Sequence, residues 1–473
     1  MKLEMYTTGD EPRSYTIIQS SVQTKGETLY FMVDAGPEDK LVTVENGAYT
    51  YLDLNHGTAE LLRREFPFTA PSRVLRLPKT LGCGDRLGLA TPGHLAAVAD
   101  TDFAPVLAQQ SIRELKLTGR SYEDVLDAAT FAVFKAGYQK PWGADGDHLK
   151  TFEEIEYALS CGYTMLTLDC SEKIHGGADK MTDGELAAAV TLNQTMLNRY
   201  LDREFLLPGD IVLTFDQRSL MEAIYTYGDA ILFTQQVYER FIKGAERDFE
   251  LSIDETATPT TPAQHFFVAN ELALRGVVLD TLAPRFCGQF QKAVDYIGDT
   301  AQFEAELRVH AAIAECFDYK LSVHSGSDKF SIFPIVGRVC GGRFHLKTAG
   351  TSWLEAVKLV AQKDPALYRE LHAFALAHFE EARQYYVVTT ELGNIPALDT
   401  LPDAELPSLF DNADARQLIH ITYGLILSAK DPEDRPLFRS RLYALWRQYA
   451  PDYAALLRAH LGRHIKQLTM ENG

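Results

Sequence analysis

The sequence predicts an α/β protein built on a (β/α)8 barrel. From about residue 76, short apolar runs that end in polar residues alternate with amphipathic helical stretches. Repeated β-then-α units imply parallel strands joined by crossover helices. Polar residues suited to chemistry also fall at or just after the ends of these runs, where a (β/α)8 barrel carries its active site.

Each barrel element rests on a local pattern. We predict strands over seven runs: Leu77–Gly84, Ala104–Gln109, Trp142–Asp147, Thr164–Asp169, Val277–Leu282, Lys320–His324 and Phe344–Lys347. We expect an eighth strand near Ile419–Tyr423. A helix over Tyr122–Ala136 follows Ser121, which is a helix-capping residue type, and ends at Gly137. Further helices are expected over Thr151–Leu159 and Ala301–Phe317.

Three regions depart from the barrel pattern. Residues 1–75 are rich in Thr, Tyr and Val and predict a small β-rich extension, with strands near Ser14–Ser20, Thr28–Val33 and Lys40–Val44. Within the barrel-type domain, 76–473, we interpret 171–270 as a helical insertion or lid over the barrel mouth. Its clearest helices are Glu185–Tyr200 and Ser219–Gly244. Residues 352–473 are expected to be largely helical.

The composition excludes several classes of protein. The net charge of −19 repels phosphate, so neither nucleic acid nor an anionic membrane is an expected partner. No apolar run approaches the ~18 residues of a membrane span, and the first residues do not resemble a signal peptide, so we expect a cytoplasmic protein. The six cysteines form no CxxC pair, which argues against a zinc ribbon, a thioredoxin motif or a secreted disulfide scaffold.

Three histidines in short, glycine-flanked settings are candidate metal ligands. His148 follows Asp147 and Gly146, and His324 and His345 lie near the ends of two predicted strands. Three protein ligands are the usual arrangement of a catalytic metal site, which favours a bound divalent cation. The alternative is that Asp147 and His148 form a polar turn before the next helix, and that His324 and His345 are structural.

Two carboxylates could move protons. Asp85 is followed by Arg86 at a predicted strand end, and Glu271 follows an apolar run in which burial would raise its pKa. The alternatives are a surface Asp–Arg pair and a helix-surface glutamate. Asp169, which also ends a strand, is a reserve ligand or acid.

Anion-binding candidates lie close to these residues. Arg86 and Arg285 are suited to a carboxylate, because a guanidinium can bind one with two hydrogen bonds. Ser325 and Lys347 stand beside two of the histidines and are typical of a loop that holds an oxyanion or a sugar. The glycines of 82–88 are spaced GxGxxxG instead of GxGxxG, and no GxxxxGK[ST] loop occurs, so nucleotide binding is weakly supported.

Several blocks of sequence resemble the bacterial tagaturonate epimerase family. They are residues 84–94, 143–150, 265–272, 282–286, 322–330 and 345–352. The resemblance implies a cytoplasmic enzyme that uses a divalent metal (Zn, Mn, Ni, Co or Fe) and interconverts the sugar acids D-tagaturonate and D-fructuronate. Homo-oligomerisation is left open.

The reaction implied by the family constrains the mechanism. The inverted carbon lies β to the ketone, so simple enolisation would scramble the wrong centre. Retro-aldol cleavage followed by aldol re-formation inverts it, and a metal held by His148, His324 and His345 would stabilise the enediolate. Asp85, Asp147 and Glu271 then compete for the acid and base roles.

Three alternative mechanisms or functions are also compatible with the sequence. One is transient oxidation of the inverted hydroxyl by a bound nicotinamide, although the glycine fingerprint is lacking. The others are a metal-dependent aldolase that releases its cleavage products and a non-catalytic sugar-acid binding protein.

Overall fold

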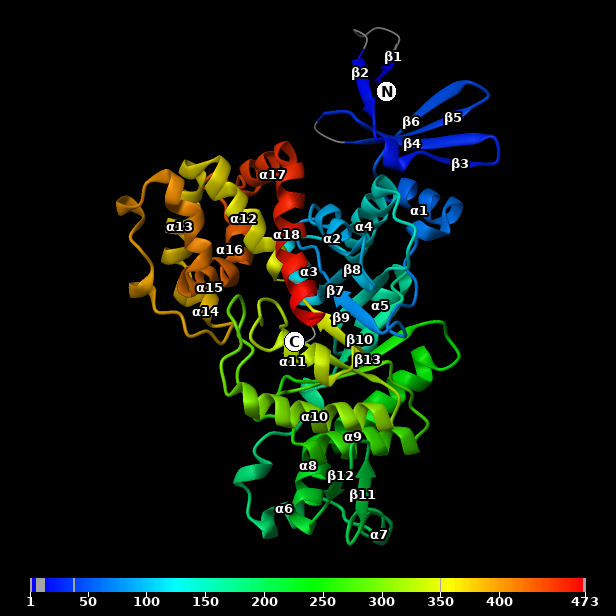
Figure 1. The fold of residues 1–473 in the computed structure, drawn as a ribbon, viewed down its shortest axis with the longest axis vertical. Coiled ribbons are helices and arrows are strands. Elements are labelled where there is room, and N and C mark those ends of the chain that lie inside the picture. Colours follow the sequence, from blue (N-terminus) through cyan, green and yellow to red (C-terminus); the bar gives the residue numbers. More distant parts are fainter. Residues whose placement is uncertain (1, 6–12, 37–38, 349, 471–473) are drawn as a thin grey trace.

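The protein is organised around a closed barrel of eight parallel strands, which confirms the predicted fold class (Figure 1). The computed structural model describes residues 2–5, 13–36, 39–348 and 350–470. Around the barrel the strands follow the order β7-β8-β9-β10-β13-β14-β15-β16 and close back on β7. Their bounds are β7 Lys79–Gly82, β8 Phe103–Ser111, β9 Gly143–Leu149, β10 Met165–Asp169, β13 Asp248–Ile253, β14 Thr281–Pro284, β15 Lys320–Val323 and β16 Phe344–Lys347.

The eighth strand is not where the sequence predicted it. It is β13, inside the region interpreted as an insertion, whereas the residues near 419–423 lie in helices α15 (Ala413–Ile421) and α16 (Tyr423–Ser428). Both errors have a physical reason. These two helices are buried in the C-terminal core, and a wholly buried helix segment reads like an apolar strand. Strand β13 carries Glu250 toward the barrel interior, and its polar residues obscured the apolar pattern.

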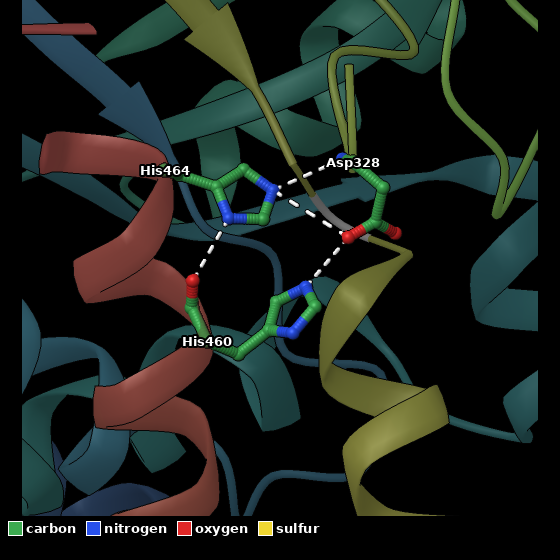
Figure 2. A group of neighbouring side chains, drawn as sticks. All are labelled: Asp328, His460 and His464. Carbon is green, nitrogen blue, oxygen red and sulfur yellow. Dashed lines mark hydrogen bonds and ion pairs between the residues drawn. The ribbon is translucent and has the colours of Figure 1, made fainter. Parts of the chain in front are cut away.

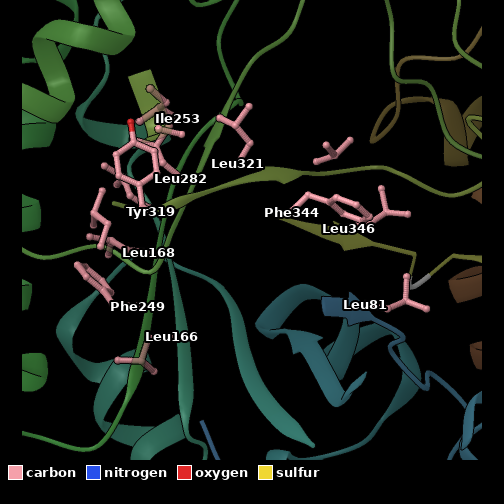
Figure 3. Packing of buried hydrophobic residues seen from close by; sticks show 14 of the residues in the cluster. Leu81, Leu166, Leu168, Phe249, Ile253, Leu282, Tyr319, Leu321, Phe344 and Leu346 are labelled. Atoms are coloured by element: carbon pink, nitrogen blue, oxygen red, sulfur yellow. The ribbon is translucent and has the colours of Figure 1, made fainter. Parts of the chain in front are cut away.

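Side chains alternate along the barrel strands. The outward residues pack against the surrounding helices in one large core, in which Figure 3 labels Leu81, Leu166, Leu168, Phe249, Ile253, Leu282, Tyr319, Leu321, Phe344 and Leu346. In β13, for example, Phe249 and Leu251 belong to this core, while Glu250 contacts the side chains inside the barrel. This alternation directs polar residues of successive strands toward a common axis.

Helices cover the outside of the barrel. They are α2 Thr91–Val98, α3 Ile112–Thr118, α4 Tyr122–Ala136, α5 Phe152–Ser160, α8 Gln217–Val237 with a π-helical turn η5 Tyr238–Ile242, α9 Pro262–Leu274, α10 Thr300–Cys316 and α11 Phe333–Val339. Helix α4 begins and ends where the sequence predicted. Ser121 and Asp124 form a capping box at its start, and Gly137 adopts the left-handed conformation (φ 63°) at its end.

The N-terminal residues form an antiparallel sheet that stands apart from the barrel, next to α1 and α4 (Figure 1). Its strands are β1 Lys2–Met5, β2 Arg13–Ile17, β3 Gln23–Lys25, β4 Thr28–Asp34, β5 Lys40–Glu45 and β6 Ala48–Asp53, with η1 Gln19–Ser21 between β2 and β3. Helix α1 (His56–Glu65) and η2 (Pro67–Thr69) connect this sheet to the barrel. The predicted strands are present, and residues 1, 6–12 and 37–38 of this extension lie outside the described residues.

A smaller insertion lies between β10 and α8. It contains η3 Ser171–Lys173, η4 Ala178–Lys180, α6 Asp183–Ala189, α7 Gln194–Tyr200, β11 Glu204–Leu207 and β12 Ile211–Thr214. The predicted single helix Glu185–Tyr200 is divided, because the Asn193 side chain caps a new helix by accepting from the amide of Met196. The insertion packs against α8 through Ala178, Leu186 and Met221.

The C-terminal residues form a helical layer with its own core beside the barrel (Figure 1). Its elements are α12 Thr351–Lys363, α13 Pro365–Ala377, α14 Phe379–Arg383, η6 Leu392–Asn394, η7 Leu398–Thr400, η8 Asp403–Asp411, α15, α16, α17 Arg439–Gln448 and α18 Ala450–Leu468. Helix α18 packs along α2 and α11 and so joins this layer to the barrel. Across the described residues, every helix is too short or too polar to span a membrane.

Candidate functional site

A cavity of about 590 Å³ opens at the carboxyl ends of the barrel strands. Its lining includes Gln109, Asp147, His148, Asp169, Asp254, Glu255, His324, Ser325 and Lys347. The other side is formed by residues of the C-terminal helical layer, among them Gly350, Tyr385, Tyr386 and Leu425. Of the region 171–270 interpreted as an insertion or lid, Asp254 and Glu255 line the cavity, whereas residues 171–216 do not. The helical layer covers the cavity.

His148 and His324 meet in this cavity. Their ring centroids are 5.1 Å apart, although they are 176 positions apart in the sequence. The backbone of His148 is left-handed (φ 52°), and its Nδ1 lies 3.2 Å from Asp169 Oδ2. Burial acts to lower the pKa of His148, but the charge of Asp147 and the hydrogen bond with Asp169 raise it above its ordinary value.

His324 is held between two further carboxylates. Its Nε2 lies 2.8 Å from Glu250 Oε1, and its Nδ1 lies 3.3 Å from Asp254 Oδ2. Burial acts to lower the pKa of His324 and Lys347 opposes its charge, yet Asp254 and Glu250 raise this pKa to about 10. Both imidazoles therefore lie in a region of excess negative charge.

The third predicted ligand, His345, does not join them. Its strand register places it opposite Thr80 and Ser322, one layer deeper in the barrel than His324 and Lys347. Its Nδ1 lies 2.9 Å from Thr80 Oγ1, and burial lowers its pKa to about 3. His345 does not line the cavity. The structure thus does not bring the three predicted imidazoles together, because side chains two residues apart on a strand share a face but differ in depth.

Lys347 fills the floor of the cavity. Its ammonium lies 2.6 Å from Asp147 Oδ1, 2.9 Å from Asp145 Oδ2 and 2.8 Å from Glu250 Oε1, and it donates to Thr167 Oγ1 at 2.6 Å. These four partners share its three protons, so Lys347 orders carboxylates and is not free to hold a substrate as predicted. Burial lowers the pKa of Lys347, but the surrounding carboxylates raise it overall.

The residues fit a divalent cation. Ligand atoms of His148, Asp169 and Glu255 lie within 4.8 Å of one another, with His324 and Asp254 beside them. Six carboxylates surround the imidazoles, and they outnumber the two lysines among them, Lys347 and Lys150. These carboxylates are Asp145, Asp147, Asp169, Glu250, Asp254 and Glu255. A divalent cation would balance this charge without protonated imidazoles. Asp169, the predicted reserve ligand, belongs to this group.

A second histidine–carboxylate cluster lies between α18 and the loop after β15 (Figure 2). His460 Nε2 lies 2.6 Å from Asp328 Oδ1 and its Nδ1 lies 3.1 Å from Glu355. His464 accepts from the Asp328 amide through Nε2 and donates to the His460 carbonyl through Nδ1. Arg416 donates to Asp328 Oδ2 at 2.6 Å. The lone pairs and charges of the Asp328, His460 and His464 side chains are thus already paired within the protein. The cluster therefore joins α18 to the loop after β15 instead of offering a metal site.

Two of the predicted acid–base residues are structural. Asp85 accepts backbone hydrogen bonds from Leu87 through Thr91 and one from the Thr91 hydroxyl, so its carboxylate shapes the loop after β7. Asp85 does not line the cavity. The predicted anion binder Arg285 also lies outside it, with its backbone paired to Thr260.

Glu271 lies on α9, away from the cavity. Its carboxylate accepts from Arg199 and Arg275, each at 2.5 Å, and from the Tyr200 hydroxyl at 2.8 Å. Burial acts to raise the pKa of Glu271, but the hydrogen bonds from Arg275, Tyr200 and Arg199 outweigh it and lower this pKa. The predicted rise is therefore wrong, because two guanidiniums accompany the carboxylate into the interior.

Sequence reasoning missed several residues of the site. Glu250, Asp254 and Glu255 belong to or follow β13, which was assigned to the insertion. Asp145 lies two residues before Asp147 on the same face of β9, and Lys292 lies in the long loop after β14. The alternation of polar and apolar residues in Asp248–Ile253 is a strand signal that could have revealed the first group.

Together, the barrel and its cavity define an enzyme-like (β/α)8 protein with an imidazole–carboxylate centre at the strand ends. The pattern of the family described as tagaturonate epimerase matches residues 15–468, so the chain belongs to the tagaturonate epimerase family. This confirms both the resemblance found in the sequence and the predicted class of enzyme, an epimerase.

Individual relatives support the same assignment. The chain is 39% identical to the tagaturonate/fructuronate epimerase of Thermotoga maritima over 96% of its own length and 97% of that protein. It is 47% identical to the fructuronate-tagaturonate epimerase UxaE of Cohnella laeviribosi. The native crystal structure of that protein and one with glycerol each superpose with a TM-score of 0.94 over 97% of both chains.

Proposed function

We propose that the protein interconverts D-tagaturonate and D-fructuronate with a bound divalent cation, by cleaving and re-forming one carbon–carbon bond. The activities named for its relatives support the pair of substrates. The observation that supports the cation is the meeting of His148 and His324 among carboxylates that outnumber the lysines. Bond cleavage is favoured because the inverted carbon lies β to the ketone.

His148, Asp169 and Glu255 would hold the cation, with His324 and Asp254 next to it. When bound, the cation would act as a Lewis acid on the ketone oxygen and stabilise the enediolate that cleavage leaves. Zn, Mn, Ni, Co and Fe all suit such mixed imidazole and carboxylate donors. His345 takes no part in this set, because its ring lies in a deeper layer.

Asp147 is the group we assign to proton transfer. Of the three predicted acid–base residues, it is the one that lines the cavity. Burial acts to raise the pKa of Asp147, but the charges of Lys347, His148 and His324 lower it, so the carboxylate is ionised and can accept a proton. Gln109 Nε2, at 3.4 Å, and Lys347 orient its two oxygens.

The cleavage and re-formation of the bond cause no net change in protons or electrons. Asp147 takes the hydroxyl proton of the inverted carbon as the bond between the α and β carbons breaks. The bonding electrons pass to the ketone half as an enediolate, and the other half becomes an aldehyde. After the aldehyde presents its opposite face, the bond re-forms and Asp147 returns the proton.

A primary isotope effect tests this mechanism. D-tagaturonate with deuterium on the inverted carbon should react at nearly the same rate as the unlabelled substrate, because that C–H bond never breaks. Activity should also disappear on chelation and return with added metal. A large isotope effect, or bound nicotinamide in active protein, would favour transient oxidation instead. Absence of any conversion in metal-loaded protein would overturn the proposed activity itself.

A further inference from the structure

The cavity has a second side whose charge is opposite to that of the imidazole centre. Arg86, Arg113 and Lys292 line it, and the carboxylates whose charge acts on Lys292 are Glu114 and, from the imidazole centre, Asp254. The loop after β7 presents Arg86, and the loop after β14 presents Lys292, so elements distant in sequence bring the cations together. Positive charge therefore exceeds negative charge at this side of the cavity.

Arg86 is buried with part of its guanidinium unused. Its side chain is 4% exposed and lies over the Tyr423 ring at 4.3 Å. Nε and Nη2 both donate to Glu114 Oε1. Nη1 has no hydrogen-bond partner among the described residues. A buried donor left without an acceptor is costly, so this nitrogen points to an acceptor supplied by a ligand.

Lys292 resembles Arg86 in having hydrogen-bond donors available for a ligand. Its ammonium donates to Ser325 Oγ at 2.7 Å, and its backbone carbonyl accepts from Gln417 at 3.1 Å, which fixes the loop. Burial and the neighbouring charge of Arg86 lower the pKa of Lys292. An anion placed between the two cations would relieve this repulsion.

We propose that Arg86 and Lys292, with Ser325, form the subsite that binds the carboxylate of the sugar acid. Ser325 directly follows His324, so this subsite adjoins the imidazole centre. A six-carbon acid can then place its carboxylate on the cations and its ketone half at the imidazoles. This assignment rests on the proposed function for the identity of the acid, and on the charges of the cavity for its orientation.

The subsite would also separate an epimerase from an aldolase. Cleavage between the α and β carbons leaves the carboxylate on the three-carbon aldehyde half. An aldehyde anchored through its carboxylate can turn about the next carbon–carbon bond without leaving. Lys292 would therefore keep the intermediate bound until the bond re-forms.

Binding of a stable acid tests the subsite without turnover. D-gluconate should bind the metal-loaded protein at least about tenfold more tightly than D-glucitol, which has the same chain without the carboxylate. Lys292→Met should weaken D-gluconate binding by about 10- to 100-fold and leave D-glucitol unchanged. Lys292→Arg should retain most of the affinity, and Lys180→Met, at an exposed position, should behave as the wild type.

Turnover gives a second readout. With D-tagaturonate, Lys292→Met should raise KM and release free aldehyde at the expense of the epimer. Equal D-gluconate affinity in the wild type and in a folded Lys292→Met variant would overturn the subsite. If Lys292→Met fails to fold, loss of D-gluconate binding in Lys292→Arg would overturn it as well. Failure of the proposed function would appear differently, as wild-type protein that binds D-gluconate but does not convert D-tagaturonate.

Discussion

Among the described residues, two clusters of histidines and carboxylates differ in what they can bind. In the cavity, His148 and His324 face carboxylates that outnumber the neighbouring lysines. On α18, His460 and His464 meet Asp328, whose second oxygen is already held by Arg416. The first cluster lines a cavity, whereas the second lies between α18 and the loop after β15.

The difference shows that ligand types alone do not define a metal site. A cation needs uncompensated negative charge and lone pairs that are not engaged elsewhere. Both nitrogens of His464 are used in hydrogen bonds with the backbone, and Arg416 supplies the positive charge that a metal would bring. The cavity cluster keeps the opposite balance.

The largest expected effect is the loss of activity on removal of the proposed divalent cation. Chelation, or His148→Ala, should lower the epimerisation rate by at least about 10³-fold, since Lewis-acid stabilisation contributes several kcal/mol. Metal analysis and kinetic assays would measure this. His460→Gln serves as the matched control and should retain metal and activity within about threefold. Full turnover after exhaustive demetallation would contradict the assignment.

Next in size is the stability of the second cluster. Asp328→Asn should destabilise the protein by about 3–5 kcal/mol, because Asp328 is buried and its replacement leaves Arg416 without its carboxylate and His460 with Glu355 alone. Denaturant unfolding would measure the loss. Asp318→Asn, which removes an exposed partner of Arg343, should cost less than about 1 kcal/mol. A variant at Asp328 that lost metal instead of stability would reverse the comparison.

The second cluster should also make stability depend on pH. Burial lowers the pKa of His460, but Asp328 and Glu355 raise it from 6.5 to about 9. A raised pKa means that this contribution is complete below pH 6.5 and is lost as the pH rises toward 9. Its size is on the order of 3 kcal/mol. Unfolding curves between these pH values would reveal it, and the slope should flatten in His460→Gln.

A smaller effect is expected at Asp254, which positions His324. Asp254→Asn should lower metal affinity by about 10- to 100-fold, as is typical when the partner of a metal-site imidazole is replaced. Competition with a chelating dye would measure the affinity. Unchanged affinity would mean that Asp254 and His324 do not contribute to the metal centre.

The smallest effect on catalysis should come from Glu271. Its carboxylate is neutralised by Arg199 and Arg275, as Asp328 is by Arg416. Glu271→Gln should keep kcat within about threefold of the wild type while lowering the melting temperature. Steady-state kinetics would show this, and a drop of 100-fold or more would restore Glu271 as a catalytic candidate.

Much of the site could be predicted from sequence because parallel strands end at one edge. Asp147, His148, Asp169 and His324 each follow an apolar run, and the barrel brings such positions together. The errors arose where burial and pairing decide the role. Glu271 follows an apolar run too, but its arginine partners come from α7 and from the end of its own helix. The depth of a side chain within the barrel could not be predicted from the sequence either, and for this reason His345 was placed in the wrong layer.

The sequence by itself determined the strand-then-helix alternation, the helix caps and the family, since these depend on local patterns and on motifs that lie within a few residues. Tertiary structure alone decided which charges are compensated. Lys347, Glu250 and Lys292 come from three different strands or loops, and the cations and carboxylates around them are tens to hundreds of residues away. Electrostatic roles depend on distance and burial in space, and neither can be obtained from neighbours along the chain.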